Sequence, residues 1–567
     1  MNRRSLLALA AGFFIVAVLL AVSGGFRVTA GGLRLSARSP LPAAVAALAA
    51  LAAWSLLARR SHSVAADLDE ASRWLERRSS LITLSLAIAS GLVAFVYATV
   101  AASGADASGY LSEAKLFAEG RLTYRDPLAS IVGGWQTGLT SPLGWRPGAL
   151  EGLQSPTYPP GLPLLMAIPH WAGGTAAACW VIAVSAAIAV WSTGTIASRL
   201  SGVAAIVAAV TLATIPVFIY QSVQPMSDVP VTAAWLLCWL ALIRRPAVAG
   251  VACAVAVLIR PNLAPLAIVP LWFVSTRVRD AVAFAVPVAL AGLALMWAQW
   301  VWYGSPLRSG YGTVGELFAF ANIRPNALFY TGVLVSTAPI LLLAPIGAWL
   351  VRRDRRAWAL TTFAALVVAA YLTYAFFDQW SYFRFLLPAL AIGSIFVGVA
   401  VARMVAGLPG SARAAVTFAV ALAIAAVGIA NARVLEAFAL KNQHHRIVQL
   451  AEHLSGSIPA DAVIIAGEQS GSMRYYTNRP IVRWEAASPE DLRRALAALQ
   501  AANRPIWFVL DAWEQEPFRA KFATVQPGML DWPPAVTAGT TPRTSAWQLD
   551  DRSRFNRGEN LPTLRLP

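Results

Sequence analysis

The chain has 567 residues, of which 57% are hydrophobic and 13% charged, and its formal net charge is +17. These proportions exclude a single water-soluble core with a polar surface and predict a polytopic α-helical membrane protein. The arginines stand in short clusters between apolar segments, as the positive-inside rule requires. They therefore predict cytoplasmic turns and no nucleic-acid partner.

Hydropathy predicts roughly thirteen membrane-spanning helices along the chain. They lie near residues 5–23, 40–57, 81–102, 175–197, 202–222, 228–243, 246–260, 262–275, 281–302, 327–350, 357–377, 384–404 and 413–431. An odd number of spans places the two ends of the chain on opposite sides of the membrane. With Arg3 and Arg4 in the cytoplasm, the large loop 103–174 and everything after residue 432 lie outside. A secretory signal peptide at the start is the alternative, and it leaves the later topology unchanged.

The sequence divides into three predicted parts. Residues 1–80 hold two extra N-terminal transmembrane helices and a basic cytoplasmic loop, and residues 81–431 form the rest of the membrane region with its large outer loop. Residues 432–567 are expected to form a small extracytoplasmic α/β domain, because short apolar strands alternate there with helices. The predicted strands are 462–466, 481–484 and 505–510, and Ser488 opens a helix with a capping-box-like pattern.

A carboxylate, Asp106, follows directly after the predicted span 81–102. Asp106, Tyr110 and Glu113 recur with i, i+4 and i+7 spacing in a helical segment, which places them on one face. Asp106 is interpreted as a functional acid or as the N-cap of a helix that begins at Ala107, and both roles are compatible.

Three further charged residues are candidates at the ends of apolar segments. Asp228 precedes Val229-Pro230, so it is a second functional acid or a helix cap. Arg260 lies between apolar helices, where an ionisable side chain needs a partner. Arg384 is a functional cation or a snorkelling anchor at a helix end. A structural role is favoured over a catalytic one for Tyr110, Glu113 and Tyr382.

Several motifs occur in a fixed order along the chain. They are Asp106-x-x-x-Tyr110-Leu111, Tyr158-Pro159-Pro160-Gly161, Gln224-Pro225-Met226-Ser227-Asp228-Val229-Pro230, Leu258-Ile259-Arg260-Pro261 and Trp380-Ser381-Tyr382-Phe383-Arg384. In the order of these motifs and the side of the membrane on which they lie, the chain resembles the GT-C glycosyltransferases. Its overall arrangement of helices and loops resembles that of the protein O-mannosyltransferases and of the aminoarabinose transferases that modify lipid A. Many of these relatives carry a second acid directly after the first, whereas this chain has Ala107 there. A metal role that depends on such an acidic pair is therefore not carried over.

The resemblance implies an inverting glycosyltransferase in the plasma membrane of a bacterium. It would move a sugar from a polyprenyl-phosphate carrier to an envelope glycan, lipid or protein acceptor on the outer face. Asp106 is then the base that deprotonates the acceptor, because the phosphate leaving group is already an anion and needs no acid. Arg384, Arg260 and Tyr382 are then the lipid-phosphate-binding residues. No cofactor is expected, and a role for a divalent metal stays open.

Two other function classes remain as alternatives. A transporter or flippase often has paired repeats and functional charges near the membrane midplane, and the sequence has no convincing repeat. A non-catalytic scaffold of envelope polysaccharide assembly is the other alternative, because the acid that relatives carry after Asp106 is missing.

Overall fold

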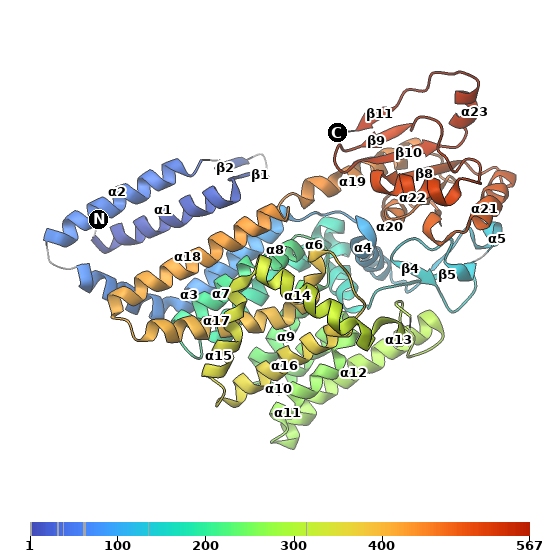
Figure 1. Cartoon of the computed structure of the whole chain (residues 1–567). Helices are drawn as coiled ribbons and strands as arrows, with labels where there is room; N and C mark the ends of the chain where they lie inside the picture. Colours follow the sequence, from blue (N-terminus) through green and yellow to red (C-terminus); the bar gives the residue numbers. More distant parts are fainter. Residues whose placement is uncertain are drawn as a thin grey trace.

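The computed structural model describes residues 3–30, 33–37, 39–60, 64–133, 135–312 and 314–566. A bundle of helices makes up most of the chain, and a domain built on a mixed sheet follows at its C-terminal end (Figure 1). The chain is thus a multi-pass helical membrane protein with a C-terminal α/β domain, as its composition predicted.

Seven helices among the described residues are long and apolar enough to cross a membrane, or up to nine if each of two bent pairs is one span. The seven include α1 (Arg3–Ser23), α2 (Leu41–Arg60), α3 (Val64–Tyr97), α6 (Gly161–Ala197), α12 (Val278–Tyr303), α17 (Leu387–Ala406) with the preceding turn η5 (Trp380–Leu386), and α18 (Gly410–Val434). The bent pairs are α7 (Gly202–Thr214) with α8 (Pro216–Ser222), and Phe320–Thr337, which contains α14 (Ile323–Thr337), with Pro339–Leu350, which contains α15 (Ala344–Leu350). Each bend falls at a proline, which cannot donate a helical hydrogen bond.

The roughly thirteen spans expected from hydropathy exceed this number. Three of them are the shorter apolar helices α9 (Asp228–Ala241), α10 (Pro246–Ile259) and the segment Pro261–Val274, which contains α11 (Ile268–Val274). A 14-residue helix is about 21 Å long, less than the hydrocarbon core of about 30 Å. A fourth, α16 (Arg355–Leu372), also lies outside the set that meets the length and hydropathy test. Hydropathy detects apolar content but does not show where a helix stops.

The N-terminal helices α1 and α2 form a hairpin that stands apart from the bundle and contacts it through α18 and α3 (Figure 1). The basic segment before the third predicted span is helical from Val64 onward and continues directly into that span as α3. Glu70 pairs there with Arg73 and Arg77 at 2.8 Å, and such pairs stabilise an exposed helix.

Close helix contacts in the bundle depend on glycine. Three glycines lie so close to the backbone of a neighbouring helix that a Cβ atom on the glycine would overlap a backbone atom of that helix. The pairs are Gly250 with Phe284, Gly347 with Phe396, and Gly398 with Ala204. Small residues allow membrane helices to approach in this way. The bundle can therefore bring distant helix ends together at one site.

The C-terminal domain contains a six-stranded sheet in the order β11-β9-β10-β8-β6-β7. The three predicted strands are confirmed as β6 (Val463–Ala466), β7 (Ile481–Arg483) and β8 (Ile506–Asp511), which are parallel. The predicted capping box is also present, with Ser488 and Asp491 at the start of α21 (Pro489–Ala501). The further strands β9 (Val536–Ala538), β10 (Thr544–Gln548) and β11 (Leu564–Leu566) were not predicted, because they are short and lie among prolines and polar residues.

Candidate active site

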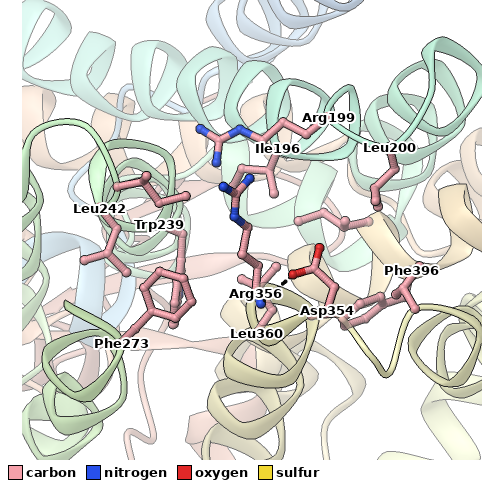
Figure 2. Close-up of a pocket in the computed structure, with 14 residues that line it drawn as sticks. Ile196, Arg199, Leu200, Trp239, Leu242, Phe273, Asp354, Arg356, Leu360 and Phe396 are labelled. Carbon is pink, nitrogen blue, oxygen red and sulfur yellow. Dashed lines mark hydrogen bonds between the residues drawn. The ribbon is translucent and has the colours of Figure 1, made fainter. Parts of the chain in front are cut away.

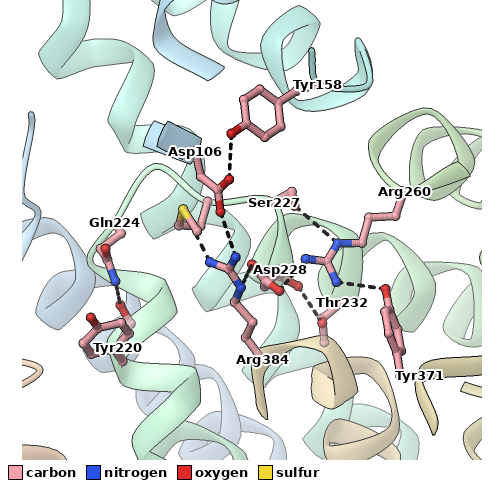
Figure 3. A network of polar contacts seen from close by, with 11 residues as sticks. Asp106, Tyr158, Tyr220, Gln224, Ser227, Asp228, Thr232, Arg260, Tyr371 and Arg384 are labelled. Carbon is pink, nitrogen blue, oxygen red and sulfur yellow. Dashed lines mark hydrogen bonds and ion pairs between the residues drawn. The ribbon is translucent and has the colours of Figure 1, made fainter. Parts of the chain in front are cut away.

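Asp106 lies in the first turn of α4 (Gly104–Ala118), whose N-cap is Ser103. The interpretation of Asp106 as the cap of a helix beginning at Ala107 is therefore wrong. Its carboxylate makes tertiary contacts instead. Oδ2 accepts a hydrogen bond from Arg384 Nη2 at 2.7 Å, and Oδ1 accepts one from the Tyr158 hydroxyl at 2.7 Å (Figure 3).

A second ion pair joins Asp228, the first residue of α9, to Arg260, the residue directly after α10. Arg260 Nη2 donates to Asp228 Oδ1 at 2.5 Å, and its other nitrogens donate to Ser227 and to the hydroxyl of Tyr371 (Figure 3). Asp228 is only 1% exposed and Arg260 only 9%. Arg260 thus has the partner that a buried charge requires, and the N-cap of α9 is Ser227 rather than Asp228.

Arg384 links the two acids. Its Nε lies 3.9 Å from Asp228 Oδ2, so the charges alternate in the order Asp106, Arg384, Asp228, Arg260. The ring of Phe385 lies between the arginines, 5.4 Å from the guanidinium carbon of Arg384 and 5.3 Å from that of Arg260. Within the described residues, Arg384 Nε and Asp228 Oδ2 have no hydrogen-bond partner. Both atoms are buried, and the charge of each is balanced by the other across 3.9 Å.

These side chains line a cavity of about 590 Å³, a size that suits a small-molecule site. The structure brings six of the seven predicted site residues to this cavity, namely Asp106, Tyr110, Asp228, Arg260, Tyr382 and Arg384. They come from four separate segments, namely α4, the start of α9, the end of α10 and η5, so the site exists only in the assembled bundle.

Glu113 lies outside the lining of this cavity. It follows Asp106 by seven positions on α4, which corresponds to about 10 Å along the helix axis. Its side chain is 1% exposed, and neither carboxylate oxygen has a hydrogen-bond partner in the described part of the chain. Burial raises the pKa of Glu113 well above its ordinary value, which favours a neutral acid.

Several lining residues did not stand out in the sequence. They are Tyr303, Tyr311, Tyr371, Tyr374, Asn262 and Gln299. Tyrosines at the ends of apolar helices are equally expected in the membrane-interface belt, so composition does not separate the two roles. Tyr158 and Asn262 carry a usable signal, since both lie in or beside the ordered motifs.

The C-terminal domain holds the chain just before Asp106. Gln469 Oε1 accepts a hydrogen bond from the Gly104 N–H at 3.4 Å, and the Tyr476 hydroxyl accepts one from the Ala102 N–H at 2.9 Å. Ser103 makes no side-chain cap bond. The first turn of the helix that carries Asp106 is therefore capped by another domain.

Glu468 adds a carboxylate at the same place. It accepts a hydrogen bond from the Ala105 backbone, and burial together with the nearby carboxylates of Glu485 and Glu514 raises the pKa of Glu468 to about 7. A negative side chain at a helix N-terminus interacts favourably with the helix dipole. The protonation of Glu468 is thus coupled to the contact between α4 and the C-terminal domain.

The described part of the chain contains no group of three or more His, Cys, Asp or Glu side chains suited to a metal ion. The two acids of the cavity each face a guanidinium group.

Comparison with known proteins gives likenesses of structure only, since no family model and no curated protein matches the chain. The chain is similar to ArnT from Cupriavidus metallidurans bound to undecaprenyl phosphate, with 13% identity, a TM-score of 0.49 and coverage of 82% of this chain and 97% of that chain. It is also similar to the archaeal oligosaccharyltransferase AglB from Archaeoglobus fulgidus in complex with an inhibitory peptide and a dolichol-phosphate, with 13% identity, a TM-score of 0.49 and coverage of 76% and 69%.

The resemblance to GT-C membrane glycosyltransferases stays an inference from the motifs, because both likenesses have 13% identity and a TM-score of 0.49. At such identities and TM-scores the likeness says nothing of substrate or mechanism. The function proposed below therefore rests on the residues of the cavity.

Proposed function

We propose that the chain is an inverting glycosyltransferase that moves a sugar from a polyprenyl-phosphate carrier to an acceptor hydroxyl. The observation that carries this proposal is the pairing of one carboxylate, Asp106, with the guanidinium of Arg384 in a cavity at the ends of the membrane helices. Helices that have an end at this cavity include α4, α9, α10, α12 and α16. A lipid-linked phosphate at head-group depth would meet these ends.

The donor phosphate binds the arginines. A guanidinium group offers planar pairs of N–H donors that match phosphate oxygens, and Arg384 and Arg260 both line the cavity. Arg260 is buried beside Asp228, and Tyr382 lies against Arg384 with its ring 4.9 Å from the guanidinium carbon. These side chains stabilise the negative charge that develops on the leaving phosphate.

Asp106 is the base. The acceptor oxygen attacks the anomeric carbon from the face opposite the phosphate, the bond from that carbon to the phosphate oxygen breaks, and the acceptor proton passes to Asp106. The sugar is transferred with inversion, and polyprenyl phosphate leaves as an anion that needs no general acid. A carboxylate has about four acceptor positions, so Asp106 can take this proton while Tyr158 keeps it oriented.

The ion pair between Asp106 and Arg384 implies that the donor binds before Asp106 acts as the base. A phosphate bound to Arg384 competes with Asp106 for the same guanidinium. Asp106 Oδ2 is then held less tightly by Arg384 and is available to the acceptor hydroxyl once the donor is in place. Donor binding would therefore activate the base.

The proposal includes the sidedness and plan expected from the sequence. The N-terminus lies in the cytoplasm of a bacterium, and the cavity and the C-terminal domain lie outside the plasma membrane, in agreement with the positive-inside rule. Residues 1–80 add an N-terminal hairpin, residues 81–431 form the catalytic membrane region and residues 432–567 the outer domain. The acceptor is an envelope glycan, lipid or protein, no cofactor is expected, and a role for a divalent metal stays open.

The experiment supplies a panel of radiolabelled polyprenyl-phosphate sugars to membrane vesicles that contain the protein. We expect label to leave the lipid fraction for at least one sugar and to appear in a product that resists mild acid. Label that crosses the vesicle membrane while still attached to its lipid would indicate a transporter instead. Label that stays in place with every donor would indicate a scaffold.

A further inference from the structure

A second hollow lies at the opposite end of the helices that form the Asp106 cavity. The helix α9 runs from Asp228 at the cavity to a turn that carries Arg244, and α16 runs from Arg356 to Tyr371 at the cavity. These helices have 14 and 18 residues, so they are about 21 and 27 Å long. The hollow therefore lies about 21–27 Å from the cavity, at the other end of these two helices.

Two arginines point into this hollow side by side (Figure 2). Arg199 follows the end of α6 and Arg356 lies in the first turn of α16. The rest of the lining is mostly apolar and includes Trp239, Phe273 and Phe396. The hollow thus combines a cationic rim with an apolar wall.

The arginines at this place lack acidic partners. None of Arg199, Arg244 and Arg356 forms an ion pair with a carboxylate in the part of the chain that the structure describes. The acid in the lining, Asp354, caps α16 and accepts a hydrogen bond from the Arg356 backbone N–H at 2.8 Å. Burial and the nearby charges of Arg356 and Arg244 lower the pKa of Arg199. An anion between the arginines would relieve this repulsion.

Tryptophans beside the hollow place it at head-group depth. Trp272, Trp349 and Trp358 are all more than half exposed. The Arg355 guanidinium lies 5.1 Å from the Trp272 ring centre, and that of Arg352 lies 4.0 Å from the Trp349 ring centre. Exposed tryptophans with neighbouring arginines are typical of the membrane–water interface.

We propose that this hollow binds the phosphate head group of an anionic phospholipid in the leaflet opposite the Asp106 cavity. Arg199 and Arg356 hold the phosphate oxygens, and the apolar wall contacts the start of the acyl chains. Basic pockets between membrane helices recognise anionic head groups by this combination of charge and depth. The site is independent of the sugar-transfer proposal, since it shares no residue with the Asp106 cavity.

Native mass spectrometry of the purified protein with dioleoylphosphatidylglycerol or dioleoylphosphatidylcholine tests this site. The wild-type chain should bind the anionic lipid about tenfold more tightly, and Arg199→Gln with Arg356→Gln should remove most of that preference. Arg403→Gln is the control, because Arg403 is an exposed arginine in the last turn of α17, outside the hollow. It should bind like the wild type.

Three results would overturn the proposal. Equal affinity of the wild type for both lipids would exclude a charge-selective site, and this comparison needs no variant to fold. An equal loss in the control variant would mean that surface charge alone attracts the lipid. Inorganic phosphate that displaces the anionic lipid at the same concentration would mean that the site takes a soluble anion.

Discussion

Arg384 Nη2 donates to Asp106 Oδ2 over 2.7 Å, although the two residues are 278 positions apart in the chain. Asp106 comes from the first turn of α4 and Arg384 from the turn that leads into α17. This contact joins the proposed base to the proposed phosphate ligand, so the two functions are coupled before any substrate binds.

Replacing Arg384 by lysine tests the phosphate role. Lysine keeps the charge but loses the planar fork that reaches Asp106, Asp228 and a phosphate together. We expect the KM for the donor to rise about tenfold or more, as expected for loss of a charge-assisted hydrogen bond, with a smaller change in kcat. Steady-state transfer by the purified protein measures both, with Arg403→Lys as the matched control. An unchanged donor KM in Arg384→Ala would contradict the assignment.

The buried pair between Asp228 and Arg260 should matter for stability. Asp228→Asn leaves the Arg260 charge without its counter-ion, and breaking a buried ion pair costs about 3–5 kcal/mol. We expect a clearly lower Tm in detergent solution. Removing both charges, with Asp228→Leu and Arg260→Met, should restore part of the decrease in Tm but should not restore activity. A single variant as stable as the wild type would show that the Arg260 charge is satisfied by other groups.

Glu113 should tolerate the loss of its charge. Its buried carboxyl group has a raised pKa and no hydrogen-bond partner among the described residues, and glutamine keeps nearly the same shape without the charge. We expect Glu113→Gln to transfer sugar within about twofold of the wild type, because no catalytic contact is removed. Transfer rate and Tm measure this directly. A loss comparable to that of a catalytic residue would assign Glu113 a chemical role.

The raised pKa of Glu468 predicts a pH dependence of stability. The pKa is about 7 in the folded protein against an ordinary 4.5, so the folded state binds the proton more tightly. The resulting stability is full below pH 4.5 and is lost as the pH rises through 7. We expect Tm to fall less between pH 5 and 8 in Glu468→Gln than in the wild type.

A second titrating group and a control variant help to interpret the pH dependence of Tm. Burial also raises the pKa of Glu514 to about 7, so part of the decline should remain in the variant. Glu490→Gln is the control, because Glu490 is exposed on α21 and pairs with Arg493. Identical pH profiles for wild type and Glu468→Gln would mean that Glu468 does not titrate in this range.

Local patterns predicted much of this molecule. Apolar runs identify the membrane class, alternation of strands and helices identifies the C-terminal domain, and ordered motifs identify six of the residues that line the cavity. Glu113 is the exception. Helical spacing places it on the same face as Asp106, but a cavity extends over only part of a helix face.

Contacts between distant segments were beyond prediction. The cap on α4 comes from Gln469 and Glu468, whose local sequence indicates only a loop after a strand. The partner of Asp106 could equally have been another arginine at a helix end. Such pairings depend on how helices of unequal length pack, and hydropathy contains no information on packing.

Donor turnover by Asp106→Asn is the measurement that tests the central claim most directly. Purified wild-type and variant protein receive the same radiolabelled polyprenyl-phosphate sugar and acceptor, and donor binding is measured alongside transfer. We expect donor binding to persist and transfer to fall by about 10²–10⁴-fold, as for loss of a general base. Transfer by Asp106→Asn at the wild-type rate would contradict the assignment of Asp106 as the base.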